Sequence, residues 1–349
     1  MRVLVTGASG FVGWHTAARL AAGGHRVRAL VRDAEKARRR LGPLGIAGDD
    51  LVVGDMTDEA AVARALAGCD AVVHAAAAVS VTRPGARDAF DQNVTGTRLV
   101  LGGACERGLA AVLFVSSLTA IFDPRAPATT GDSPLVRSAT RYGRSKAASD
   151  RLARDLQAAG APVCIVYPSG VLGPDDNPGL SESVRAWRGF LRATLRSSGG
   201  TWFVDVRDLA ELHVRLLERR APGRCVAAGH SFTWDALTAL LEEVSGASIR
   251  RISAPGWLLR AAGRLADGAG RLRAARFPIS GEGMAIATRW RPVADSPELA
   301  ALGVSWRAPR ETLEDMLRWL VEAGRLPAHA APRIAQRTGL VSNQRSALS

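Results

Sequence analysis

The chain begins Met1-Arg2-Val3-Leu4-Val5-Thr6-Gly7-Ala8-Ser9-Gly10-Phe11-Val12-Gly13, and this stretch decides the fold. The apolar run 3–5 is typical of a strand that is buried on both faces of a parallel sheet. Three glycines follow at a spacing of three, and a helical stretch, 15–22, comes after them. A strand, a glycine turn and a helix N-terminus in this order form a site for a pyrophosphate. The sequence therefore predicts an α/β fold, a Rossmann-type doubly wound parallel sheet.

Each glycine of this turn has its own expected role. Gly7 permits the tight turn, Gly10 lets a phosphate approach the backbone, and Gly13 lets helix and strand pack closely. The remaining residues of the expected cofactor turn are Ser9, Phe11 and Val12.

The second apolar run, 26–31, ends where a Rossmann fold contacts the adenosine ribose. Arg32 stands at this position, with Arg39 in a basic cluster one helix later, and both favour the 2′-phosphate of NADP. Asp33 would instead favour NAD if the register moved by one residue. The sequence therefore predicts NADP, with NAD as the weaker alternative.

Strands and helices alternate through the first half of the chain, which indicates a parallel sheet with helices on both faces. The expected strands are 2–6, 26–31, 51–53, 71–74, 111–116 and 162–167. The expected helices are 11–22, 34–41, 58–67, 87–107 and 140–159.

The pattern changes after Pro168, where residues 170–174 are expected to form a loop. A strand at 202–206 and a helix at 207–219 follow, and the remainder from about 229 is mainly helical in character. We expect a dinucleotide-binding domain and a smaller, mostly helical substrate lobe at the C-terminal side. The expected boundaries are 1–168 with 203–228 for the domain, 169–202 with 229–326 for the lobe, and 327–349 for a loose tail.

Tyr142 and Lys146 stand four residues apart, which places both side chains on one face of a helix. The chain has only two tyrosines and two lysines, so one of each at this spacing indicates function. A tyrosine hydroxyl titrates near ~10, and a neighbouring ammonium favours the phenolate. Such a pair exchanges a proton with a substrate near neutral pH. Alone, the pattern also fits a solvated surface helix.

The net charge of +13 raises the question of nucleic acid. The arginines are spread over every segment, so no nucleic-acid partner is expected. The four cysteines and six histidines are scattered, and neither disulfides nor a metal site are expected. The first strand begins at residue 2 and no apolar run is long enough to span a bilayer, so a cytoplasmic location is expected.

Several ordered segments extend the pattern beyond the glycine turn. They are Val52-Val53-Gly54-Asp55-Met56, Val72-Val73-His74-Ala75-Ala76-Ala77, Asn93-Val94-Thr95-Gly96-Thr97, Phe114-Val115-Ser116-Ser117, Tyr167-Pro168-Ser169-Gly170-Val171-Leu172-Gly173-Pro174 and Val204-Asp205-Val206-Arg207-Asp208-Leu209-Ala210. With the Tyr–Lys pair, the chain over roughly residues 1–245 resembles the extended short-chain dehydrogenase/reductase family, which belongs to the NAD-dependent epimerase/dehydratase superfamily. It is most similar to the branch of dihydroflavonol reductases and 3β-hydroxysteroid dehydrogenases.

The resemblance implies roles for individual residues. Tyr142 would exchange a proton with the substrate oxygen, and Lys146 would lower the tyrosine pKa and bond the nicotinamide ribose. Ser116 and Ser117 are both candidates for the serine that orients the substrate carbonyl or hydroxyl, and alignment on the Ser-Ser pair favours Ser117. Ser116 would then point into the sheet or toward the cofactor. The resemblance also places the cofactor against Asp55, Met56, Ala75, Ala76, Ala77, Asn93, Pro168, Gly170 and Val171. His74 is expected to be a packed, hydrogen-bonded residue rather than a base.

The resemblance favours an NADP-dependent oxidoreductase that interconverts a carbonyl and an alcohol on a hydrophobic small molecule. A dehydratase is disfavoured because the stretch 117–122 contains no carboxylate. A nucleotide-sugar epimerase and a non-catalytic dinucleotide-sensing regulator stay open as alternatives. A homodimer through helices 87–107 and 140–159 is a family-level expectation.

Two features of the lobe allow more than one interpretation. Its aromatic residues either line an apolar pocket or form the core of the lobe. They are Trp187, Phe190, Trp202, Phe232, Trp234 and Trp257. The stretch 257–273 is either a packed lobe helix or a basic amphipathic helix on a membrane surface.

Overall fold

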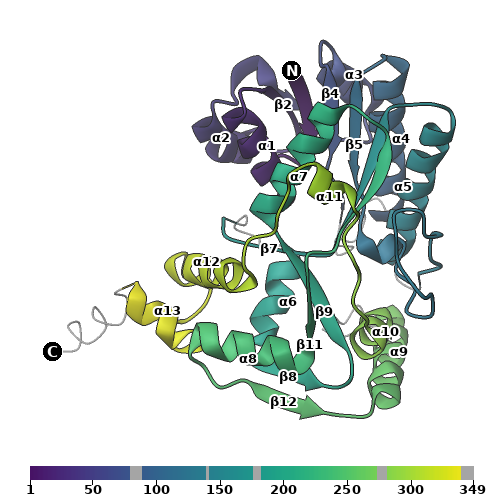
Figure 1. Cartoon of the computed structure of the whole chain (residues 1–349). Helices are drawn as coiled ribbons and strands as arrows, with labels where there is room; N and C mark the ends of the chain where they lie inside the picture. The colour runs from purple at the N-terminus through teal and green to yellow at the C-terminus, as the bar shows by residue number, and fades with distance from the viewer. Residues whose placement is uncertain (79–88, 139–140, 176–181, 273–280, 339–349) are drawn as a thin grey trace. The chain divides into compact units, whose positions relative to one another are not determined.

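The computed structural model describes residues 1–78, 89–138, 141–175, 182–272 and 281–338 (Figure 1). The chain divides into two compact units. The first comprises residues 1–169, 206–228 and 294–305, and the second comprises residues 170–205, 229–293 and those from 306 onward. The domain boundaries expected from the sequence stay a prediction.

The first unit contains a seven-stranded parallel sheet in the order β10-β6-β5-β4-β1-β2-β3. Its strands are β1 (Arg2–Thr6), β2 (Arg26–Val31), β3 (Leu51–Val53), β4 (Ala71–His74), β5 (Ala111–Val115), β6 (Val163–Pro168) and β10 (Gly223–Ala227). The strand order reverses between β1 and β4. In open α/β sheets, ligands bind outside the carboxyl ends of the strands at such a switch point. The predicted fold class is confirmed.

Helices cover both faces of this sheet (Figure 1). They are α1 (Phe11–Ala22), α2 (Ala34–Leu41), α3 (Glu59–Leu66), α4 (Ala89–Glu106), α5 (Arg141–Ala158), α7 (Val206–Arg219) and α11 (Glu298–Ala301), with short 3-10 turns η1 (Gly42–Leu44), η2 (Gly48–Asp50) and η3 (Leu118–Ala120). α1 packs against α7, while α3 packs on α4 and α4 packs on α5. The strands between these two layers are buried almost throughout, which explains their continuous apolar sequences.

The register of the sheet aligns the strand ends that carry the expected site. Thr6 of β1 lies beside His74 of β4, and His74 lies beside Phe114 of β5. Because these parallel strands end at the same level, the turns that follow them all leave the sheet at the carboxyl ends of the strands. Residues that are far apart in the sequence therefore meet there.

The second unit mixes short strands with helices. Its elements are β7 (Gly170–Leu172), α6 (Glu182–Phe190), β8 (Ala193–Arg196), β9 (Gly200–Asp205), β11 (His230–Thr233), α8 (Trp234–Ser245), β12 (Arg250–Ser253), α9 (Gly256–Leu272), α10 (Gly281–Arg289), α12 (Pro309–Glu322), η4 (Ala328–Ala330) and α13 (Pro332–Arg337). β11, β9 and β7 form one small sheet, and β12 pairs with β8 in another. The helical character expected after about 229 is present, with strands added to it.

One sequence expectation is wrong in this half of the chain. Residues 170–172 form β7, not a loop, because β9 supplies a parallel partner from further along the chain. Two further segments make contacts that were not predicted. Residues 294–305 belong to the first unit, where Ser296 bonds the backbone of Val226 at the open edge of β10. Within the segment expected as a loose tail, Pro332–Arg337 form α13, which buries Ile334 against neighbouring helices.

The aromatic residues of the second unit mostly form its core. The rings of Trp187 and Phe203 make an edge-to-face contact, with 5.0 Å between the ring centroids. Trp187, Trp202 and Trp234 are buried. Trp257 differs, because 64% of its surface on α9 is exposed. α9 packs on α10, and contact of its exposed face with a membrane stays a prediction. Among the described residues, no helix is both long and apolar enough to cross a bilayer.

A buried histidine makes the stability of the first unit sensitive to acid. His213 of α7 bonds Thr16 of α1 at 2.9 Å, and burial lowers the pKa of His213 from 6.5 to about 3. The unfolded chain therefore binds one more proton than the folded chain between these two values. The free energy of unfolding should fall as the pH drops through this window, by about 2 kcal/mol at pH 5 from this residue.

Urea unfolding of the parent protein and His213→Leu at pH 7 and pH 5 measures this effect. We expect the difference between the two pH values to be smaller in the variant. Equal pH dependence in both proteins would contradict a neutral, buried His213.

Candidate active site

The glycine turn after β1 is sterically closed on two sides. Gly7 has a φ of +74°, and a Cβ there would lie 2.8 Å from the backbone nitrogen of Ala76. A Cβ on Gly13 would lie 2.2 Å from the carbonyl oxygen of Gly7. A Cβ on Gly10 would meet only that same oxygen, at 3.1 Å. Gly7 and Gly13 therefore serve the packing of the turn, whereas Gly10 leaves the space in front of it clear.

The N-terminus of α1 is suited to an anion. Gly10 is its N-cap, no side chain caps it, and its first turn, which contains Phe11 and Val12, carries no acidic residue. The first backbone N–H groups of a helix have no partner within the helix and carry partial positive charge. Together with Ser9 and the clear space at Gly10, these amides fit the pyrophosphate of a dinucleotide.

The structure distinguishes Arg32 from Asp33, the two residues after β2 that could contact the adenosine ribose. Asp33 is the N-cap of α2, and its carboxylate accepts a hydrogen bond of 2.9 Å from the backbone of Lys36. Arg32 is exposed at the end of the strand. Arg39 forms an ion pair of 3.0 Å with Glu35, and both side chains are exposed. The capping role of Asp33 favours Arg32 as the residue directed to the ribose.

The turn after β3 places Asp55 and Met56 near the same strand ends. Asp55 accepts hydrogen bonds from the backbone and the hydroxyl of Thr57, at 2.9 and 2.8 Å. Met56 packs on Gly96 of α4, where a Cβ would lie 2.6 Å from the Met56 side chain. The glycine in the Asn93–Thr97 stretch thus makes room for Met56.

His74 at the end of β4 is held on both sides. Its Nδ1 lies 2.7 Å from the hydroxyl of Thr6, and its Nε2 lies 3.2 Å from that of Thr97. Burial, with a smaller contribution from the ammonium of Lys146, lowers the pKa of His74 from 6.5 to about 3. His74 is therefore a neutral, packed residue rather than a base.

The strand end continues through Ala75, Ala76 and Ala77, which are half-buried. Asn93 of α4 fixes the next residue, Ala78. Its amide oxygen accepts from the Ala78 N–H at 2.7 Å, and its amide nitrogen donates to the Ala78 carbonyl at 3.1 Å.

Asn93 also reaches the helix of the Tyr–Lys pair. Its amide nitrogen donates to the hydroxyl of Ser145 at 3.1 Å, one residue before Lys146. This contact of Ser145 was not predicted from the sequence. The amide of Asn93 thus joins the end of β4 to α5.

The two serines after β5 have different surroundings. Ser116 is buried and donates a hydrogen bond of 2.6 Å to the carboxylate of Asp150. Ser117 is half-buried and caps η3, and its hydroxyl lies 2.9 Å from that of Thr119. Because a carboxylate already engages Ser116, these surroundings favour Ser117 as the serine that contacts a substrate.

Lys146 is buried at the end of β5. Only 7% of its surface is exposed, its Nζ donates to the carbonyl of Val115 at 3.1 Å, and it lies 5.7 Å from the centre of the Phe114 ring. Burial lowers the pKa of Lys146 to about 8, and the charge of Asp150 opposes this decrease. The ammonium form therefore persists at neutral pH but loses its proton far more readily than an ordinary lysine does.

The other expected residues lie in three places. Tyr142 belongs to α5, one turn before Lys146, but its side chain lies outside the described residues. Pro168 ends β6 in the first unit, and Ser169 after it donates to the carbonyl of Ala228 at 2.7 Å. Gly170 and Val171 begin β7 and belong to the second unit.

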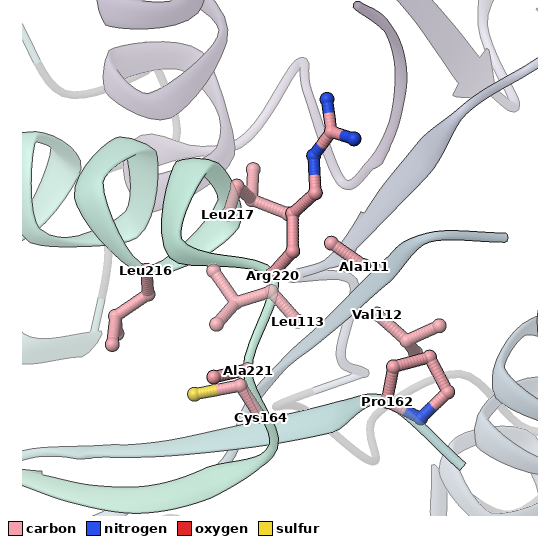
Figure 2. A pocket seen from close by; sticks show the side chains of 9 residues that line it. All are labelled: Ala111, Val112, Leu113, Pro162, Cys164, Leu216, Leu217, Arg220 and Ala221. Carbon is pink, nitrogen blue, oxygen red and sulfur yellow. The ribbon is translucent and has the colours of Figure 1, made fainter.

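A shallow apolar depression lies elsewhere in the first unit (Figure 2). It is lined by residues at the amino ends of β5 and β6 and at the end of α7, including Ala111, Pro162 and Leu217. Since the expected site follows the carboxyl ends of these strands, the depression is not part of it.

Comparison with known proteins identifies the family. Residues 3–229 match the model of the NAD dependent epimerase/dehydratase family. The chain belongs to this family. The resemblance to extended short-chain dehydrogenases/reductases, inferred from the motifs, is thereby confirmed.

Relatives within the epimerase/dehydratase family carry out different reactions. The chain is 30% identical to sterol demethylase protein B of Methylococcus capsulatus, over 76% of this chain and 81% of that protein. It is 32% identical to cinnamoyl-CoA reductase 1 of Oryza sativa, over 65% of this chain and 71% of that protein. A solved UDP-glucose 4-epimerase from Bifidobacterium longum, in complex with NAD+ and UDP, has the same fold, with a TM-score of 0.70 and 19% identity over 93% of this chain and 99% of that one.

The different surroundings of the glycines lead to a binding prediction. Gly10→Ala should fold and lose affinity for the dinucleotide by at least about tenfold, because its methyl group occupies the space expected for the phosphate. Gly102→Ala is a matched control on α4, where a Cβ would meet nothing within 4 Å. Calorimetric titration with NADPH and NADH measures the affinities, and equal affinity in both variants would contradict the assignment.

The buried ammonium can be observed directly, because the chain has only two lysines. Isotope labelling of the lysine side chains should give two NMR signals, and Lys36→Arg removes one of them and so assigns both. We expect the Lys146 signal to titrate with a midpoint near pH 8, as its environment requires. A midpoint near the ordinary lysine value of about 10.4 would contradict its burial.

Proposed function

We propose that this protein is an NADP-dependent oxidoreductase that interconverts a ketone or aldehyde and the corresponding alcohol on a hydrophobic small molecule. The observation that supports this most strongly is the placement of Lys146. Its ammonium is buried beside the carbonyl of Val115, the last residue of β5, which precedes Ser117 by two residues. Lys146 itself lies one helical turn after Tyr142 on α5. This is the arrangement that proton transfer to a substrate oxygen requires.

Each residue of the proposed triad has one task. Tyr142 exchanges a proton with the substrate oxygen, and the positive charge of Lys146 lowers the pKa of the tyrosine. Ser117 donates a hydrogen bond to the substrate oxygen and orients it. The turn of Gly10 would hold the dinucleotide, which would supply a hydride as NADPH in the reduction and accept one as NADP+ in the oxidation.

The segment after Ser117 argues against additional acid–base chemistry. Leu118, Ala120, Ile121 and Phe122 are buried apolar residues. The next carboxylate in the sequence, Asp123, accepts a hydrogen bond from the backbone of Arg125. A dehydratase needs an extra acid and base near the substrate, and this segment supplies neither.

A nucleotide-sugar epimerase is the second candidate, because the family and its solved structures include such enzymes. An epimerase returns its cofactor to the starting state in each cycle, whereas a reductase consumes NADPH. A dinucleotide sensor without turnover is the third candidate, and it has no need of the Tyr142–Lys146 pair.

A screen of NADPH oxidation against steroids, flavonoids, aryl ketones and aliphatic aldehydes tests the proposal. We expect net consumption with at least one class. Tyr142→Phe should then lower kcat by at least about 100-fold, the usual contribution of a positioned proton donor, while it retains NADPH binding. Sugar interconversion without net NADPH loss would establish the epimerase, and equal behaviour of parent and variant would establish the sensor.

Cofactor choice has its own test. Arg32→Ala should raise the KM for NADPH by about tenfold or more and leave the KM for NADH little changed, because only NADPH has a 2′-phosphate for the guanidinium. Arg38→Ala, on the neighbouring helix, is the control. An unchanged ratio of the two KM values in Arg32→Ala would exclude this residue from the phosphate site.

A further inference from the structure

The helix of the Tyr–Lys pair continues its pattern beyond the pair. Tyr142, Lys146, Asp150 and Arg154 recur at a spacing of four along α5, so they form one stripe on the helix. Only the first two belong to the Tyr–Lys motif that is recognisable in the sequence. Asp150 and Arg154 turn the stripe into an alternation of positive and negative charge.

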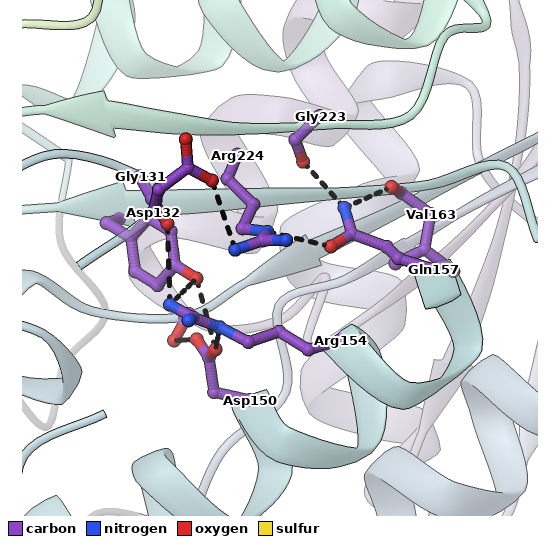
Figure 3. A network of polar contacts seen from close by, with 10 residues as sticks. Gly131, Asp132, Asp150, Arg154, Gln157, Val163, Gly223 and Arg224 are labelled. Carbon is purple, nitrogen blue, oxygen red and sulfur yellow. Dashed lines mark hydrogen bonds and ion pairs between the residues drawn. The ribbon is translucent and has the colours of Figure 1, made fainter. Parts of the chain in front are cut away.

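Asp150 accepts three hydrogen bonds within a network of polar side chains, part of which Figure 3 shows. None of its surface is exposed. One carboxylate oxygen accepts from the Ser116 hydroxyl at 2.6 Å. The other accepts from Arg154 Nε at 2.8 Å and from the Tyr167 hydroxyl at 3.0 Å. A buried carboxylate is tolerated only with such partners, and loss of one partner is costly.

Arg154 links the Tyr167 hydroxyl to the chain around Gly131. Its Nη2 donates to the Tyr167 hydroxyl at 2.9 Å and to the carbonyl of Gly131 at 3.4 Å. Tyr167 thus donates to Asp150 and accepts from Arg154. Its pKa is raised, chiefly by burial, so it remains a neutral phenol.

The stripe holds the last residue of β5 and the residue that follows it. Lys146 donates to the carbonyl of Val115, and Asp150 accepts from the side chain of Ser116. The next residue is Ser117. These two hydrogen bonds fix the end of the strand against α5. Because one of them is made by Asp150, the position of Ser117 relative to Lys146 depends on Asp150.

The charges that face Lys146 also depend on Asp150. His74 of β4 faces it from the sheet and is neutral above pH 3, because its pKa is about 3. Tyr142 precedes it on the helix, and Asp150 is the acid that acts on it, in the direction that favours the ammonium. Arg154 forms an ion pair with the same carboxylate, at 2.8 Å from its other oxygen.

We propose that Asp150 is the positioning residue of this site: its carboxylate fixes Ser116, and through it Ser117, and its negative charge balances the ammonium of Lys146. This inference rests on the proposed function, because it assigns Ser117 and Lys146 the roles given above. It adds that the second tyrosine of the chain, Tyr167, supports the site and takes no part in proton transfer.

The lysine NMR titration tests the electrostatic part on the intact protein without any substrate. Asp150→Asn should lower the midpoint of Lys146, because the balancing charge is lost, and Asp150→Glu should restore it toward the parent value. The signal of Lys36 is the internal comparison. An unchanged Lys146 midpoint in a folded Asp150→Asn protein would overturn the proposal, even if no substrate is known.

The mechanical part is tested by two variants that each remove one hydrogen bond to the same carboxylate. Ser116→Ala releases the β5 side and should lower kcat by about tenfold, since small misplacements of catalytic groups are costly. Tyr167→Phe releases the β6 side and should change kcat by less than about twofold, although loss of the buried hydrogen bond lowers the urea midpoint of unfolding. Equal effects of the two variants on kcat would show a merely structural network and overturn the proposal.

Failure of the proposed function and failure of the role of Asp150 give different results. If the carbonyl screen finds no turnover, the proposed function fails while the titration still decides the role of Asp150. If Asp150→Asn does not fold, the comparison of Ser116→Ala with Tyr167→Phe decides it.

Discussion

A buried ammonium at the end of a parallel strand is the constraint on which this structure depends. Removing a charge from water costs several kcal/mol unless partners replace the lost hydration. Lys146 has the carbonyl of Val115, the face of Phe114 and the charge of Asp150. These partners come from β5 and α5, so the ammonium is stable only when helix and strand are in register. The same partial compensation leaves its pKa near neutrality, where a neighbouring phenol benefits from its charge.

The rest of the site is built on the aligned strand ends. The close packing of Gly7 on the backbone of Ala76 ties the phosphate turn to the end of β4. Asn93 ties the same strand end to α5 through Ser145. The glycine turn and α5 are thus both held at the end of β4, the first by steric packing and the second by hydrogen bonds. Both contacts exist because the order of the sheet places these strand ends side by side.

The sequence predicted the first unit well because its signals are local. Strands such as β2 and helices such as α1 follow from short apolar runs, glycine turns and helical periodicity, and they agree with the structure residue by residue. β7 and the edge contact of Ser296 were missed because their partners lie far away in the chain. The role of Asp150 was missed for the same reason: its spacing from Lys146 was visible, whereas its bond to Ser116 exists only in the folded chain.

A crystal structure of the complex with NADPH tests the role of the buried ammonium directly. We expect Nζ of Lys146 within hydrogen-bond distance of the nicotinamide ribose while it retains the carbonyl of Val115, with the hydroxyl of Tyr142 facing the nicotinamide ring. A dinucleotide bound elsewhere, or a Tyr142 hydroxyl directed away from the ring with Lys146 exposed to solvent, would contradict it.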